Sequence, residues 1–73
     1  MQILIFANNY QQARLYAKDN GLRPGKFSVV IEQERLMGLD PEQYSDVFLD
    51  GWEDNADVKE AVEYWKMKRS FHG

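Results

Sequence analysis

Apolar residues gather in three short runs along the chain, and polar or turn-forming residues separate these runs. They are QILIFA at 2–7, KFSVVIE at 26–32 and DVFLD at 46–50. Runs of this length that are rich in Ile, Val and Phe are typical of strands covered on both faces of a sheet. The pattern therefore predicts three buried strands.

Two further segments have the three-to-four residue spacing of helices. Residues 10–20 follow Asn9, a favourable N-cap, and precede Gly21, a common C-terminal stop with Leu22 placed for the usual hydrophobic contact. Residues 56 to about 71 follow Asn55, which we expect to cap the second helix. Between the last two strands, Asp40-Pro41 predicts only a short helical turn.

The order of these elements is strand, helix, strand, turn, strand, helix. Apolar strands joined by helix-sized connections predict an α/β fold with a small three-stranded, mainly parallel sheet and right-handed crossovers. Such a β-α-β-turn-β-α unit is half of a Rossmann-like or flavodoxin-like domain. We expect a single domain over 1–73 and the strand order 2-1-3, because the two helices then cover opposite faces.

The composition excludes some kinds of chemistry and argues against others. The chain has 73 residues and no cysteine, which excludes disulfides, thiolate nucleophiles and Cys-based metal sites. The first apolar run is too short for a signal peptide or a membrane span, so we expect a cytoplasmic protein that does not enter a membrane. The net charge of −3 argues against tight, non-specific binding of nucleic acid.

Ligands of open parallel sheets bind beyond the carboxyl ends of the strands. Here Asn8 and Asn9 follow the first strand, and Asp50 and Gly51 follow the third. The first turn contains no glycine and no Lys, which nucleotide phosphates require there. We therefore expect no nucleotide cofactor.

Metal binding and catalysis are also not expected. The acids Asp50, Glu53, Asp54 and Asp57 lack the spacing of a calcium loop, and acids are common at helix N-termini. His72 is the only histidine and lies near the end of the chain. These features predict a chain that is not an enzyme.

The last helix carries more apolar surface than a three-stranded sheet needs. We expect its stripe of Val58, Ala61, Val62 and Trp65 to face the core. A second stripe and one loop residue remain as candidate partner-binding residues, since aromatic side chains are common anchors of protein interfaces. The candidates are Trp52, Tyr64, Met67 and Phe71.

Two resemblances bear on the function. The segments ILIFANN and DVFLDG are similar to the first and third strands of receiver domains, although Asn8 and Asn9 replace the acidic pair. The segments NNYQQARLYAKDNGL, RLMGLD and DVFLDGW resemble small uncharacterised proteins of actinobacteriophages. That resemblance implies a phage accessory protein in the host bacterial cytosol that binds a host or phage protein.

The main hypothesis is thus a non-enzymatic protein–protein interaction module that binds another protein. A homodimer is the oligomeric state considered for it. One alternative is a nucleic-acid accessory factor that uses the basic residues Lys66, Lys68, Arg69 and Arg14. The other is a degenerate pseudo-receiver that signals through its fold without phosphorylation of Asp50.

Overall fold

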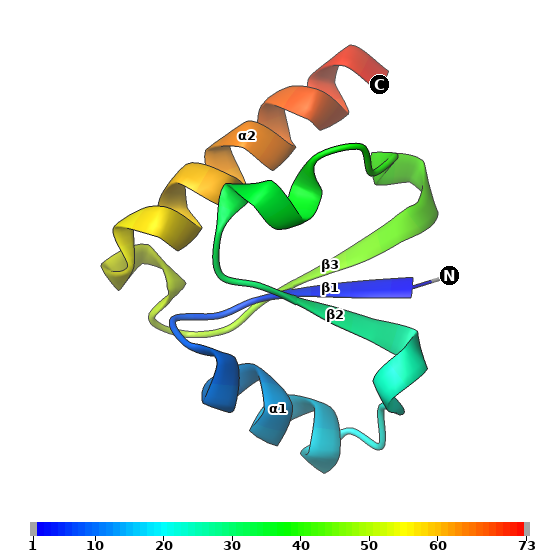
Figure 1. The fold of residues 1–73 in the computed structure, drawn as a ribbon, viewed down its shortest axis with the longest axis vertical. Helices are drawn as coiled ribbons and strands as arrows, with labels where there is room; N and C mark the ends of the chain where they lie inside the picture. Colours follow the sequence, from blue (N-terminus) through cyan, green and yellow to red (C-terminus); the bar gives the residue numbers. More distant parts are fainter. Residues whose placement is uncertain (1, 73) are drawn as a thin grey trace.

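The fold is seen in a computed structural model, which describes the backbone of residues 2–72 and the side chains of residues 2–71. The chain forms three strands and two α-helices in the order strand, helix, strand, strand, helix (Figure 1). Their bounds are β1 Gln2–Phe6, α1 Tyr10–Asp19, β2 Phe27–Val30, β3 Tyr44–Phe48 and α2 Ala56–His72. Four short 3-10 helices lie in the connections: η1 Pro24–Lys26, η2 Gln33–Leu36, η3 Pro41–Gln43 and η4 Trp52–Asp54.

The sheet is parallel and has the order β2-β1-β3, as the sequence predicted. The central strand β1 pairs with β2 from Ile3 opposite Phe27 to Phe6 opposite Val30. It pairs with β3 from Gln2 opposite Tyr44 to Phe6 opposite Phe48. Both β2 and β3 are therefore edge strands, and the fold is the small α/β unit that we expected.

The two helices cover opposite faces of this sheet (Figure 1). Leu4 and Phe6 of β1 point to the α2 side, whereas Ile5 between them points to the α1 side, since side chains alternate along a strand. The α2 side holds the larger core, to which that helix contributes Val58, Ala61, Val62 and Trp65. This confirms the predicted core stripe of α2.

The predicted helix caps are present. Asn9 Oδ1 accepts the backbone N–H of Gln12 at 2.8 Å, and Asn55 Oδ1 accepts those of Asp57 and Val58 at 3.0 and 3.4 Å. Gly21 has a φ of 67°, and the next N–H bonds to Ala17 O at 2.8 Å, which is the usual helix ending at glycine.

The predicted third strand was two residues out of place. The apolar run indicated residues 46–50, but β3 is Tyr44–Phe48. Tyr44 and Ser45 belong to the strand because their backbone lies beside Gln2 and Ile3 of β1. An apolar run misses such residues, since the backbone and not the side chain forms the ladder.

The predicted second strand, residues 26–32, was too long, because β2 spans only Phe27–Val30. Its last residue lies opposite Phe6, where β1 itself ends. A strand at the edge of a sheet ends where its partner ends, so Ile31 and Glu32 leave the sheet.

Over the part of the chain that is described, no helix has both the length and the apolar character to cross a membrane.

Candidate functional site

The carboxyl edge of the sheet, where ligands bind in open α/β folds, is tied together by side-chain amides. Asn8 Nδ2 donates to the carbonyl of Gly51 at 2.7 Å, and Asn55 Nδ2 donates to the carbonyl of Asn8 at 2.7 Å. Asn8 therefore links the turn after β1 both to the turn after β3 and to the start of α2.

Gln12, in the first turn of α1, completes this network. Its Nε2 donates to the carbonyl of Asp50 at 2.7 Å, and its Oε1 accepts the backbone N–H of Asn8 at 3.0 Å. Sequence reasoning singled out Asn8 and Asp50 at this edge but missed Gln12. The side-chain amides of Asn8, Gln12 and Asn55 are thus hydrogen-bonded to backbone groups of the loops at this edge.

The acids near this edge are spread over a loop and a helix start. Asp50, Glu53, Asp54 and Asp57 are all exposed. Within the described residues, no three His, Asp or Glu side chains come together as metal ligands would. The side chain of His72 lies outside the described part of the chain.

The four predicted partner-binding residues do not form one patch. Trp52 lies in η4, half-buried, with its ring 5.8 Å from that of Phe48. Tyr64, Met67 and Phe71 lie in the second half of α2, where Met67 is 53% and Phe71 is 83% exposed. At 1.5 Å per residue, Phe71 is about 20 Å along the helix axis from the start of α2, next to which Trp52 lies.

Two of the three basic residues at the end of α2 contact other groups of the chain, whereas Lys66 is exposed. Arg69 forms an ion pair with Asp46 at 2.9 Å and donates to the carbonyl of Tyr44 at 3.1 Å. Lys68 lies 5.9 Å from the ring centroids of Tyr64 and Trp65. These cations are therefore less available to nucleic-acid phosphates than the sequence suggested.

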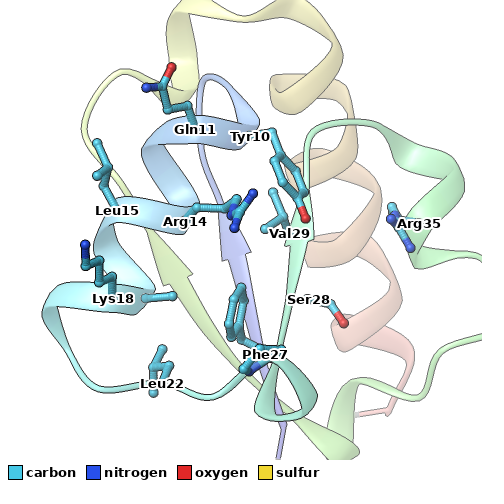
Figure 2. Close-up of a pocket in the computed structure, with 12 residues that line it drawn as sticks. Tyr10, Gln11, Arg14, Leu15, Lys18, Leu22, Phe27, Ser28, Val29 and Arg35 are labelled. Atoms are coloured by element: carbon cyan, nitrogen blue, oxygen red, sulfur yellow. The ribbon is translucent and has the colours of Figure 1, made fainter.

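A groove lies on the other side of the molecule, between α1 and the free edge of β2 (Figure 2). It is open to solvent and has a volume of about 1140 Å³. Ala17, Leu22 and Val29 form its apolar floor, and the rings of Tyr10 and Phe27 lie along it. Tyr10 is 50% exposed, so one wall of the groove presents a ring to solvent.

The groove follows β2 on both faces of the sheet. Phe27 and Val29 belong to the core on the α1 side, whereas Val30 belongs to the core on the α2 side. Ser28 alternates with these residues and points with Val30. Figure 2 shows Ser28 and Arg35 beyond the strand and Arg14 on the α1 side.

This groove was not predicted, although its helix wall has a sequence signal. Tyr10, Arg14 and Lys18 follow one another at i, i+4 and i+8, which places them along one side of α1. Arg14 lies 5.9 Å from the ring centroid of Tyr10. Which strand this side of the helix faces depends on the fold, and so the groove itself could not be recognised from the sequence.

Comparisons of the chain with protein-family models, with curated proteins and with solved structures found no match. The site must therefore be interpreted from its own geometry.

Proposed function

We propose that this chain is a non-catalytic protein-interaction module that binds an extended segment of a partner protein along the free edge of β2. The observation that carries this proposal is the groove itself, which runs beside an edge strand and has an apolar floor. An edge strand offers unpaired backbone N–H and C=O groups, and peptides commonly bind to such edges as an added strand.

The unpaired edge of β2 supports this mode of binding. Within residues 2–72, β1 is the only strand paired with β2. No backbone hydrogen bond outside the sheet involves Phe27–Val30 in this described part. The outward-facing backbone groups of β2 are thus unpaired in the described residues, and the partly exposed Phe27 and Ser28 are the most accessible part of this edge, since Val29 and Val30 are buried.

The state of the carboxyl edge supports a role in binding over one in catalysis. The side chains of Asn8, Gln12 and Asn55 there serve as links between loops. General acid–base catalysis needs an enclosed cleft in which two titratable groups have different pKa values. The groove along β2, by contrast, is lined by no carboxylate and is open along its length.

The wider context of this function follows from the resemblance to actinobacteriophage proteins. On that basis we propose a phage accessory protein that acts in the host bacterial cytosol on a host or phage protein. The three aromatic residues Trp52, Tyr64 and Phe71 and the neighbouring Met67 remain predicted contacts for a partner or for a second copy of the chain. The pseudo-receiver hypothesis gains no support from the groove.

A selection from a random ten-residue peptide library tests the proposal. A selected peptide should shift the amide resonances of Phe27–Val30 in an isotope-labelled sample and protect the outward-facing ones from hydrogen exchange. Tyr10→Ala should weaken its binding at least fivefold, because the exposed ring forms one wall of the groove.

Phe71→Ala is the matched control, since it also removes an exposed ring but lies on α2. Unchanged binding in this variant is expected. If Phe71→Ala weakens binding and Tyr10→Ala does not, the docking site is on α2 and the proposal of a β2 site is wrong. A selection that yields no peptide with shifts in β2 would also contradict it.

A further inference from the structure

We infer that the segment bound along β2 is acidic, with Asp or Glu side chains on both faces of the added strand. This inference rests on the proposed function and names the chemistry of the partner. The charges around the groove differ from those of the whole chain.

The groove is basic although the protein is acidic. The chain has nine Lys and Arg against twelve Asp and Glu. Three of the cations, Arg14, Lys18 and Arg35, line the groove, and none of the acids does. A local concentration of one sign of charge attracts ligands of the opposite sign and orients them as they approach.

These three cations are not neutralised within the chain. In the described residues 2–71, the ion pair that the structure contains is Asp46–Arg69. No side-chain hydrogen bond involves Arg14, Lys18 or Arg35 over the same residues, and all three are exposed. Their charges are therefore free to meet carboxylates of a partner.

The position of the cations fits an extended peptide. Arg14 and Lys18 lie on the α1 side of β2, and Arg35 lies beyond the strand on the opposite side (Figure 2). Successive side chains of an added strand point to opposite faces of the sheet. Acidic residues at neighbouring positions of such a strand would therefore reach cations on both faces.

The same charges disfavour a second copy of this chain as the occupant. A symmetric pairing of two β2 edges would bring the Arg14, Lys18 and Arg35 sets of both copies to one interface. Like charges that face each other across strands are destabilising. Charged residues at an edge strand also prevent such self-pairing in other proteins.

A single-stranded nucleic acid is the other anionic ligand to consider. Its bases would need several exposed rings on which to stack, and the groove offers Tyr10 and the half-buried Phe27. The floor of Ala17, Leu22 and Val29 and the free backbone edge suit a peptide instead. The observations therefore favour an acidic polypeptide.

Three matched peptides test this inference. They share a strand-forming frame of Val, Thr and Ser and carry Glu, Gln or Lys at three variable positions. At low salt we expect the Glu peptide to bind at least tenfold more tightly than the Gln peptide, and the Lys peptide to bind least. The Glu preference should shrink as salt screens the charges.

Substitution of each groove cation shows which side chains cause the preference for the Glu peptide. Arg14→Gln, Lys18→Gln and Arg35→Gln should each reduce the Glu preference two- to threefold and weaken the binding of the Glu peptide. Lys59→Gln, which removes an exposed cation of α2, serves as the matched control and should change neither. A loss of preference in the control to the same extent would overturn the inference.

The outcomes separate the inference from the proposed function. Equal binding of the Glu and Gln peptides at β2 would overturn the acidic partner and leave the peptide site standing. Binding of none of the three peptides, together with a failed library selection, would overturn both. Tighter binding of a twelve-nucleotide single strand than of the Glu peptide at β2 would also overturn the inference, because the groove would then recognise phosphates.

Discussion

At the scale of single residues, four side-chain amides determine how the loops at the end of the sheet are held. Asn9 and Asn55 cap the two helices, and Asn8 and Gln12 connect the loops. Asn55 does both, because its Oδ1 caps α2 while its Nδ2 donates to Asn8 O. Sequence reasoning recognised the caps, whereas the links join residues more than 35 positions apart.

Asn55 allows the cap and the link to be separated by substitution. Asn55→Ala removes both and should lower the free energy of unfolding by about 2 kcal/mol. Asn55→Asp keeps the capping oxygen but sets a carboxylate oxygen against Asn8 O in place of the donor, so a loss of at least about 1 kcal/mol is expected. Urea unfolding followed by circular dichroism measures both values.

Asn9→Ala is the control for these variants, since Asn9 caps α1 through Oδ1. It should cost about 1 kcal/mol. An Asn55→Ala variant no less stable than Asn9→Ala would show that the link between the loops contributes nothing.

At the scale of elements, α2 carries two apolar stripes with different roles. The stripe that ends at Trp65 is buried, and the indole Nε1 donates to Asp46 Oδ1 of β3 at 2.9 Å. The neighbouring stripe leaves Met67 and Phe71 in solvent. Helical spacing identified both stripes and also indicated which one is buried, as the core on the α2 side confirms.

Truncation of one ring from each stripe tests this assignment. Trp65→Ala should lower the free energy of unfolding by about 3–5 kcal/mol, because it leaves a cavity in the main core. Phe71→Ala should change it by less than about 0.5 kcal/mol, since the side chain is 83% exposed. Chemical denaturation compares the two, and a large loss in Phe71→Ala would contradict the exposed position.

At the scale of the whole molecule, size and charge distribution are the main properties. A domain of 73 residues buries only about 60% of the surface that its unfolded chain exposes, less than larger domains do, and is expected to have low stability. Three of its cations line the β2 groove, whereas Glu32, Glu34, Asp57 and Glu60 line a second hollow beside η2 and the start of α2. Because its own stability is low, binding of a partner is expected to raise the free energy of unfolding noticeably.

Ligand binding should stabilise the entire chain. At a free concentration of one hundred times Kd, the Glu peptide should raise the free energy of unfolding by about 2.7 kcal/mol if it binds only the folded state. Thermal unfolding with and without the peptide measures this gain. Tyr10→Ala should show a smaller gain at the same peptide concentration, and an identical gain would contradict binding at the groove.

Local sequence features determined the elements of this protein. The apolar runs, the caps at Asn9, Asp40 and Asn55 and the stop at Gly21 act within a few residues, so they can be identified from the chain alone. The sequence alone did not fix the strand order, although the hypothesis of 2-1-3, in which two helices cover opposite faces, agrees with the structure. Strand ends were less accurate, since pairing with β1 sets them.

Only the tertiary structure decided the candidate site. Tyr10, Arg14 and Lys18 are one side of a helix in the sequence, and Phe27 and Arg35 belong to other elements. They meet because the right-handed crossover from β1 packs α1 over the sheet beside β2. A groove depends on which surfaces remain uncovered after packing, and no local pattern in the chain records this.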